Sequence, residues 1–242
     1  MDEFWIYQSI IIGMLLYLLT NTRPDITYAV SQVAPFNHNP KKSHTSAMKT
    51  IIRYLKRTED KGTIVTPTGT PALDCYVDAN YAGLHGCDPD YSASSAKSRT
   101  DCIIMLGGCP ILWKSQLQQT EISLSTLESK YSALSASMQT LLPLVSLVGE
   151  SFKELKLPPD FKSTISCRVF KDNNGALLLA TKQRITNRTK YFLVKWHFFW
   201  HHVTNVDVQV LTVATTDQFA DHLTKGLNRK MFERTWKLAQ GW

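Results

Sequence analysis

Three aspartates stand where their side chains could converge on one site. Asp78 ends one expected strand and Asp172 ends another, while Asp221 lies in an expected helix at 217–225. Acids at the carboxyl ends of strands can meet where backbone polar groups are free and a metal ion can be held. The placement of these three acids therefore predicts a shared carboxylate pocket.

Clustered carboxylates bind hard cations, and this decides which chemistry such a pocket could support. Two-metal hydrolysis of a phosphodiester uses Mg²⁺ ions about 4 Å apart to stabilise the attacking and leaving oxygens. The alternative is that Asp78 and Asp172 only cap turns, which is the commoner role of a single aspartate after a strand. The ordered set of three acids favours the metal site.

The region after the linker-like stretch 66–71 has the pattern of a sheet with helices around it. The expected strands are 72–78, 101–106, 110–114, 165–172 and 208–213. The expected helices are 126–141, 150–156, 173–181, 189–203 and 217–225. Three strands in succession, followed by helices that alternate with strands, predict an α/β fold with a mixed sheet.

Residues 7–58, ahead of this linker, carry helical signals instead. Pro24 suits the first position of a helix, and a further helix fits residues 43–57. The second helix would be apolar on one side and basic on the other, where Arg53 and Lys56 lie. The basic side is either a solvated surface or one that follows phosphates, and the residues alone leave both interpretations open.

The composition limits the partners and the compartment. The chain has 27 Lys and Arg against 20 Asp and Glu, a net charge of +7, which suits a polyanionic partner without proving one. Its five cysteines show no Cys-x-x-Cys spacing and are interpreted as buried thiols in a reducing compartment. The apolar run 10–19 is shorter than the roughly 20 residues that span a bilayer, so no membrane segment is expected.

The chain resembles the C-terminal part of the Pol polyproteins of copia-type LTR retrotransposons. From about residue 10 to 235, blocks in the family's order carry the resemblance: "GMLLYLLTNTRPDITYAV", "AMKTIIRYLKRT", "YVDANYAG", "KSRTD", "ILWKSQLQQTEISLSTLESKY", "KDNNGAL", "NRTKYFLVKWHFF" and "TTDQFADHLTKGL". Three of these blocks are similar to the family's K-S-T-S-G, C-D-N-x-x-A and T-x-D-Q-x-A-D-x-x-T-K. Agreement of this kind along most of a chain does not arise by chance.

The resemblance implies a ribonuclease H-like five-stranded mixed sheet flanked by helices at 72–228. It also implies a reverse transcriptase thumb or connection segment at 1–65 and a C-terminal tail at 229–242. The family's activity would be cutting of the RNA strand of RNA·DNA hybrids with two Mg²⁺ or Mn²⁺ ions. The implied setting is intracellular, in a cytoplasmic virus-like particle or in the nucleus, with the polymerase palm and fingers upstream in the same polyprotein.

The catalytic set implied by the resemblance is Asp, Glu, Asp, Asp, and its glutamate is missing here. Asp78, Asp172 and Asp221 fall on the three aspartates, but Lys130 stands at the position of the metal-facing glutamate. An ammonium group there would repel a metal ion or pair with Asp78 or Asp172 in its stead. We therefore expect Mg²⁺ binding and cleavage to be impaired, with metal occupancy reduced.

Glu128, two residues earlier, is no substitute for the missing acid. Ser125 followed by Glu128 three positions later is a capping-box pattern, which predicts a structural role at a helix start. Two residues along a helix differ by about 200° in direction, so Glu128 should point away from the side presented by Lys130. Two further departures from the family pattern are Asn80 and Tyr81, at positions of an acid and a tryptophan.

The stretch 173–206 contains no acid and alternates basic with aromatic residues. Its candidate nucleic-acid contacts are Lys182, Arg184, Arg188, Lys190 and Lys195. Part of its aromatic set should instead pack against the sheet, because Phe192, Trp196 and Phe199 follow helical spacing. His197 and His201 have a zinc-compatible spacing, but no Cys pair or His-Glu-x-x-His pattern accompanies them.

Two classes of function remain open for the chain as a whole. The first is a ribonuclease H-type enzyme acting through Asp78, Asp172 and Asp221. The second is a binding module that holds an RNA·DNA hybrid or RNA without cutting it, and Lys130 is the residue that discriminates between them. An integrase core on the same fold is disfavoured by the helical block ahead of the sheet, and no adjacent Asp-Asp pair of a polymerase palm occurs.

Overall fold

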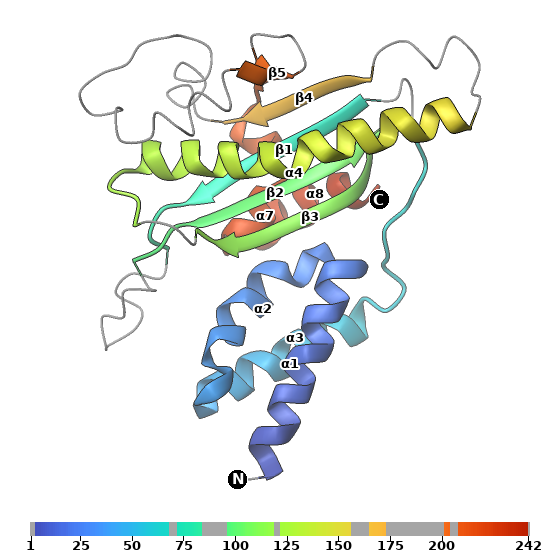
Figure 1. Ribbon diagram of the computed structural model, residues 1–242. Helices are drawn as coiled ribbons and strands as arrows, with labels where there is room; N and C mark the ends of the chain where they lie inside the picture. Colours follow the sequence, from blue (N-terminus) through green and yellow to red (C-terminus); the bar gives the residue numbers. More distant parts are fainter. Residues whose placement is uncertain are drawn as a thin grey trace.

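The computed structural model describes residues 3–67, 72–83, 96–118, 122–155, 165–172, 201–203 and 208–241. An N-terminal helical segment lies beyond the β3 edge of a five-stranded sheet (Figure 1). This segment holds α1 (Glu3–Asn21), α2 (Thr27–Val33) and α3 (Lys42–Arg57), with 3₁₀ turns η1 (Pro24–Ile26) and η2 (Ala34–His38) on either side of α2.

The helical segment has a small apolar core of its own. Ile12, Leu15, Val30, Met48 and Ile51 come from its three α-helices and are buried together. Pro24 begins η1, where its missing N–H is not needed, as the sequence predicts. The indole of Trp113 in β3 donates a hydrogen bond to the carbonyl of Leu19, which fixes α1 against the sheet.

The sheet has the order β3-β2-β1-β4-β5. Its strands are β1 (Ala72–Asn80), β2 (Arg99–Leu106), β3 (Cys109–Leu117), β4 (Ser166–Lys171) and β5 (Gln209–Thr212). β2 is antiparallel to both β1 and β3, whereas β4 is parallel to β1 and to β5. The carboxyl ends of β1 and β4 therefore lie next to each other, and their arrowheads point the same way in Figure 1.

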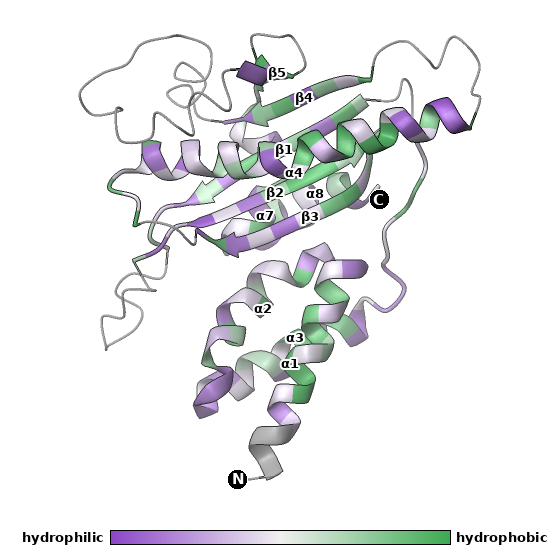
Figure 2. Ribbon diagram, viewed as in Figure 1, coloured by the Kyte–Doolittle hydropathy of each residue, from purple (hydrophilic) through white to green (hydrophobic). Residues whose placement is uncertain are grey.

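Helix α4 (Thr126–Glu154) lies across one face of the sheet (Figure 2), and its apolar residues pack against the strands. Tyr131, Leu134, Met138 and Leu141 recur at helical spacing and are buried against β1 and β2. α4 is long and apolar enough to cross a membrane by length and composition. Its packing in the largest core explains that composition in another way, because a core helix passes the same test.

Residues 126–141 are helical as predicted, but the predicted break before a second helix at 150–156 is wrong, because α4 runs unbroken through Pro143. Proline inside a helix removes one backbone hydrogen bond and costs about 3 kcal/mol. The turns beyond Pro143 still place Leu144, Val145 and Val148 against the core, and burial of such side chains offsets that cost at about 1.5–3 kcal/mol each when complete.

The opposite face of the sheet is covered by the C-terminal elements η5 (Thr215–Asp217), α7 (Asp221–Thr224) and α8 (Arg229–Gln240). Leu223 and Ala239 are buried there against Ile103 and Met105 of β2. The single helix predicted at 217–225 is wrong, because Gln218 adopts an extended conformation and separates η5 from α7. Residues 229–240, which the sequence placed in a C-terminal tail, form a helix with a buried side.

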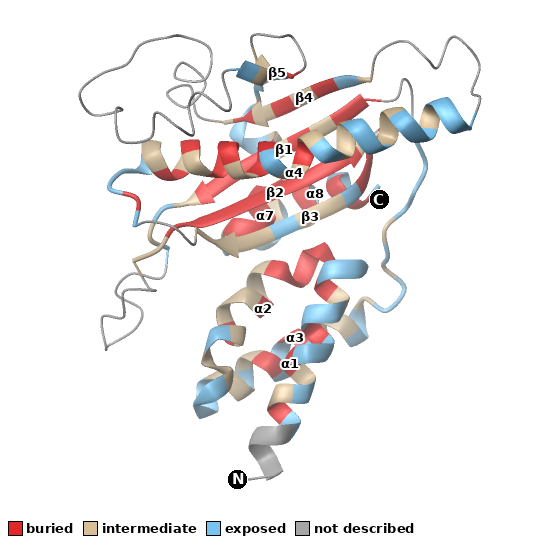
Figure 3. Ribbon diagram, in the orientation of Figure 1, coloured by how far each residue is buried: buried red, intermediate tan, exposed pale blue. Residues whose placement is uncertain are grey.

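The predicted fold class is confirmed: a five-stranded mixed α/β sheet flanked by helices, with helices ahead of it. Burial is deepest along the central strands, as Figure 3 shows. Four of the cysteines are buried thiols as expected, and Cys87 lies outside the described residues. The helix predicted at 173–181 also lies outside them, as does 189–203 apart from helical residues 201–203. The domain boundaries at 65, 72 and 228 stay a prediction.

Candidate metal and nucleic-acid site

The three aspartates meet at the carboxyl ends of β1 and β4. The side chains of Asp78, Asp172 and Asp221 each place one carboxylate oxygen within 4.8 Å of the others. The register pairs Tyr76 with Phe170, two residues before Asp78 and Asp172, so parallel pairing sets these two acids side by side. Asp221 reaches them from the first turn of α7. This cluster could hold a divalent metal ion, as the sequence predicts.

Lys130 enters the same cluster from the first turns of α4. Its ammonium nitrogen lies 3.2 Å from Asp172 Oδ1 and 3.6 Å from Asp78 Oδ1. The prediction that Lys130 pairs with the aspartates is therefore confirmed, and it reaches both candidates instead of one. Its side chain is 13% exposed, so Lys130 is partly accessible to solvent.

A second cation, Lys225, approaches from the end of α7. Its ammonium nitrogen lies 3.1 Å from Asp221 Oδ1 and 3.2 Å from Asp78 Oδ2. The hydroxyl of Thr224 donates to the same Asp78 oxygen at 3.4 Å. Lys225 is 39% exposed, which makes it the most accessible of the cations around the aspartates.

A third cation, Lys171, lies wholly inside the protein at the end of β4. Its ammonium group donates to the carbonyl of Val77 at 2.8 Å and lies 3.6 Å from Asp78 Oδ1. Burial is the largest influence on this group and lowers the pKa of Lys171 to about 8. Three aspartates and three lysines therefore give a cluster with no formal net charge.

The aspartates respond differently to these cations. Burial by itself would raise the pKa of Asp78, but Lys171, Lys225 and Lys130 together hold it below its ordinary value. Burial and then the neighbouring charge of Asp78 raise the pKa of Asp221 to about 6, in spite of Lys225. Asp78 is ionised near neutral pH, and its Oδ1 makes ion pairs but no hydrogen bond with the described residues.

A fourth buried acid lies beside the cluster and was not predicted. Asp101 of β2 pairs directly with Asp78 of β1 and is fully buried. Burial is the largest influence on this group and raises the pKa of Asp101 well above its ordinary value. Burial thus disfavours the charged form of Asp101, which makes it a poor replacement for the missing glutamate as a metal ligand.

The start of α4 shows why Glu128 does not face this site. Ser125 is the N-cap, and its hydroxyl accepts a hydrogen bond from the Glu128 backbone N–H at 3.1 Å, as the sequence predicts. The Glu128 carboxylate accepts from the Leu124 backbone N–H at 2.8 Å, one residue before the predicted partner. The Glu128 carboxylate thus accepts a backbone hydrogen bond from the loop before α4, whereas Lys130 faces the aspartates.

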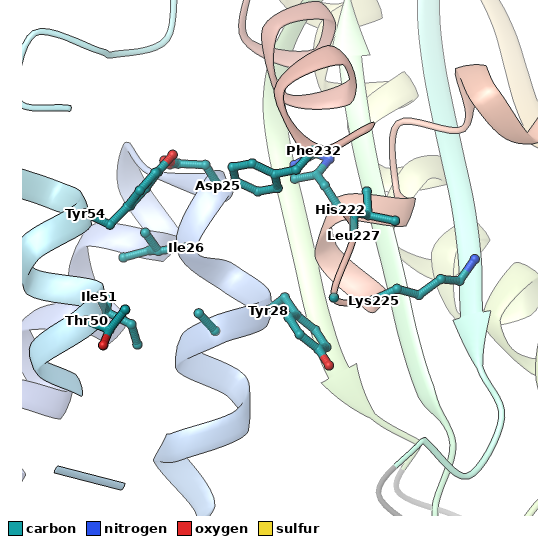
Figure 4. Close-up of a pocket in the computed structure, with 12 residues that line it drawn as sticks. Asp25, Ile26, Tyr28, Thr50, Ile51, Tyr54, His222, Lys225, Leu227 and Phe232 are labelled. Carbon is teal, nitrogen blue, oxygen red and sulfur yellow. The ribbon is translucent and has the colours of Figure 1, made fainter. Parts of the chain in front are cut away.

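Lys225 also connects the cluster to a cavity of about 290 Å³ between the helical segment and the C-terminal helices. Figure 4 shows Tyr28, Tyr54 and Ile51 on the helical side and His222 and Leu227 on the other, with Lys225 extending away from the helices. Burial lowers the pKa of His222 to about 4, so its ring is neutral. This cavity is mostly apolar, and the carboxylates of the cluster lie outside it.

Sequence comparison then decides the family. The Pol polyprotein of transposon RE1 from Arabidopsis thaliana is 35% identical over 223 residues, covering 92% of this chain and 14% of the relative. That of transposon TNT 1-94 from Nicotiana tabacum is 32% identical over the same share of this chain and 15% of its own. The chain belongs to the Pol polyproteins of copia-type retrotransposons. It spans about one seventh of the length of these relatives.

Two other comparisons accompany this result for the copia-type chain. No family model matches it. A solved foamy viral protease-reverse transcriptase in complex with an RNA/DNA hybrid is similar in structure, with a TM-score of 0.49 and 10% identity. The match covers 93% of this chain and 26% of the foamy viral chain.

The copia-type pattern also contained the signal for the residues that sequence reasoning missed. Lys171 stands where the family's C-D-N block has its cysteine, and Asp101 stands where K-S-T-S-G has its glycine. Both residues are charged types at positions that the fold buries completely. A charged residue in place of a small or apolar one on a strand could have marked them before the structure was known.

The predicted nucleic-acid contacts are only partly within the described residues. Arg53 and Lys56 are exposed on α3, as a basic helix face requires. The predicted contacts Lys182, Arg184, Arg188, Lys190 and Lys195 lie outside the described residues, as does His197. Their role as nucleic-acid contacts, and the catalytic role of the three aspartates, stay predictions.

Proposed function

We propose that this chain is the ribonuclease H-type module of a copia-type Pol polyprotein, and that its cleavage of the RNA strand of RNA·DNA hybrids is strongly impaired. The observation that carries the proposal is the convergence of Asp78, Asp172 and Asp221 within 4.8 Å. Such a set is what two-metal phosphodiester hydrolysis requires. The impairment rests on the lysines that occupy the same cluster.

The residues present do not fit a pair of Mg²⁺ or Mn²⁺ ions. A hard cation needs carboxylate oxygens that are free to bind it. Here the ammonium groups of Lys130, Lys171 and Lys225 lie 3.1–3.6 Å from those oxygens. A metal ion would have to displace at least Lys130 while being repelled by the other two charges. We therefore derive no catalytic step through a metal in this chain.

The test is a cleavage assay on a labelled RNA·DNA hybrid with Mg²⁺ or Mn²⁺. Lys130→Glu restores an acid in the cluster, so it should cut at least about tenfold faster than the wild type, in line with the cost of disturbed metal ligation. Asp78→Asn placed in the Lys130→Glu background should abolish that gain. A wild-type chain that cuts as fast as Lys130→Glu would refute the impairment.

The second candidate is a binding module that holds a hybrid, or RNA, without cutting it. The formal neutrality of the cluster favours this candidate, because three lysines remove the repulsion between the aspartates and a phosphate backbone. If Lys130→Glu also fails to cut, while both chains bind a hybrid, the binding module is the better description. In either case the polymerase palm and fingers would lie elsewhere in the polyprotein, and the setting would be intracellular.

A further inference from the structure

We propose that the cluster is a metal-independent contact for a phosphodiester, with Lys130 and Lys225 in the place of divalent cations. The inference rests on the proposed function, because it takes an RNA·DNA hybrid as the ligand. It adds that binding of the hybrid at this site does not need Mg²⁺. The reasons are the number of donors on the two lysines, their exposure and the charge of the pocket.

The number of N–H donors on each ammonium group allows both lysines to bind an oxygen atom of a ligand. An ammonium group carries three N–H donors and no acceptor. Lys130 has two carboxylate partners among the described residues, Asp78 and Asp172, and Lys225 likewise has Asp78 and Asp221. Each ammonium group therefore has one donor beyond its carboxylate partners, and a phosphate oxygen can accept it.

Exposure separates these two lysines from the third. The side chain of Lys130 is 13% exposed and that of Lys225 is 39% exposed, whereas Lys171 is entirely buried. A phosphate arriving from solvent can reach the first two cations. Lys171 contributes by neutralising the charge of Asp78, since its ammonium nitrogen lies 3.6 Å from Asp78 Oδ1.

The charge of the pocket decides whether a metal is needed. Three ionised carboxylates without cations would repel a phosphodiester, and a bound metal would have to reverse that repulsion. With the three lysines the formal charge is zero, and Lys130 and Lys225 are partly accessible to solvent while Asp78 is buried. A phosphate oxygen therefore meets ammonium donors first, with no divalent ion present.

Fluorescence anisotropy with a labelled 2′-O-methyl-RNA·DNA hybrid, which resists hydrolysis, measures this directly. The wild-type Kd should change less than about twofold between excess EDTA and millimolar Mg²⁺. Lys130→Glu replaces a donor with an acid, so its Kd in EDTA should rise about tenfold and Mg²⁺ should largely restore it. Lys130→Gln should lower the slope of log Kd against log salt by about 1, as expected for one lost phosphate contact.

Lys153 supplies a matched control on the same helix. It is exposed in the last turn of α4, 23 residues from Lys130 and thus roughly 35 Å away along the helix axis. Lys153→Glu makes the same change in net charge, so it separates a local contact from a general loss of positive charge. Its Kd should stay within about twofold of the wild type in both buffers.

The outcomes distinguish this inference from the proposed function. Wild-type binding that disappears in EDTA and returns with Mg²⁺ overturns the inference and leaves hybrid binding intact. Lys130→Glu that binds in EDTA as tightly as the wild type, or no more weakly than Lys153→Glu, overturns it as well. A wild-type chain that binds no hybrid in either buffer removes the proposed function itself.

Discussion

The chain buries aspartates beside cations in two regions, and the two arrangements differ. In the helical segment, Arg23 donates to both oxygens of Asp25 at 2.9 and 2.7 Å, and the Tyr54 hydroxyl donates to the same carboxylate at 2.7 Å. Arg23 also donates to the carbonyl and hydroxyl of Thr58, just beyond α3. One carboxylate there accepts two hydrogen bonds from a guanidinium and one from a hydroxyl. This network connects η1 to the end of α3.

The cluster at the strand ends has the opposite character. Three carboxylates share three ammonium groups at 3.1–3.6 Å, and Asp78 Oδ1 has ion pairs without a hydrogen bond among the described residues. Asp221 is held at a raised pKa of about 6, which means that its charge is disfavoured in the fold. Stability alone does not call for three acids in one place.

The difference separates a structural ion pair from a candidate binding site. Removing either partner of a buried, fully hydrogen-bonded pair costs much stability, because the remaining charge has no other partner. In a cluster with several like charges, the loss of one charge costs less stability, because it relieves the repulsion among the charges that remain. The Asp25 network holds the segment together, whereas the strand-end cluster keeps the geometry of a cation site with lysines inside it.

Asp25→Asn should give the largest loss of stability. It leaves the Arg23 guanidinium, whose side chain is 9% exposed, without its anion, and breaking a buried pair costs about 3–5 kcal/mol. The free energy of unfolding, measured in urea, reports the loss. Asp172→Asn is the matched change in the cluster, and it should cost less than about 1 kcal/mol because Lys130 keeps Asp78 as a partner. Equal losses for the two variants would remove the distinction between the regions.

Lys171→Met tests the buried cation of the cluster through pH. The pKa of Lys171 is about 8 in the fold against an ordinary 10.5, so the folded chain binds fewer protons than the unfolded chain. Stability carried by this group is therefore present above pH 10.5 and is lost as pH falls through 8. Relative to Lys171→Met, the wild type should gain up to about 3 kcal/mol between pH 8 and 10.5.

Urea unfolding of both chains at several pH values in that window measures the difference. Lys153→Met is the control, because it makes the same substitution at an exposed lysine in the last turn of α4, far from the cluster. A flat difference between wild type and Lys171→Met would mean that the ammonium of Lys171 is hydrated and does not lie inside the cluster.

Thermal unfolding with and without Mg²⁺ tests whether the wild type and Lys130→Glu bind the ion. A ligand that binds only the folded state stabilises it by RT ln(1 + [L]/Kd), which is about 1.4 kcal/mol at a tenfold excess over Kd. Lys130→Glu should show a gain of this size in millimolar Mg²⁺, and the wild type should show none. Wild-type stabilisation equal to that of Lys130→Glu would place a functional metal site in the chain as it stands.

Much of this cluster could be predicted from the sequence, because each aspartate carries a local signal. Asp78 and Asp172 follow strand patterns, and parallel pairing then brings their carboxyl ends together. Lys130 was visible as a cation at an acid's position in the resemblance. Lys171 and Asp101 carried a weaker signal, a charged residue where the family pattern has a small or apolar one, and only the strand register and the ion-pair distance show that both lie beside Asp78.

The errors in the expected helices have the same origin in tertiary structure. Propensity predicts a break at Pro143, yet apolar contacts beyond it hold α4 together. Propensity also predicts one helix through Gln218, but its side chain donates to the carbonyl of Val77 and accepts from the Ala220 backbone N–H. These competing hydrogen bonds stop η5 and start α7 where Asp221 can reach the cluster.

Ser125→Ala should have only a small effect, and it separates the position of Lys130 from its charge. Loss of the N-cap removes the hydrogen bond from the Glu128 backbone N–H and costs about 1 kcal/mol of stability in urea. The next turns of α4 stay packed through Tyr131 and Leu134, so Lys130 should keep its place and hybrid binding should be unchanged. Ser125→Thr should recover the lost stability. If Ser125→Ala weakened hybrid binding as much as Lys130→Glu, the contact would depend on how α4 begins and not on the ammonium group alone.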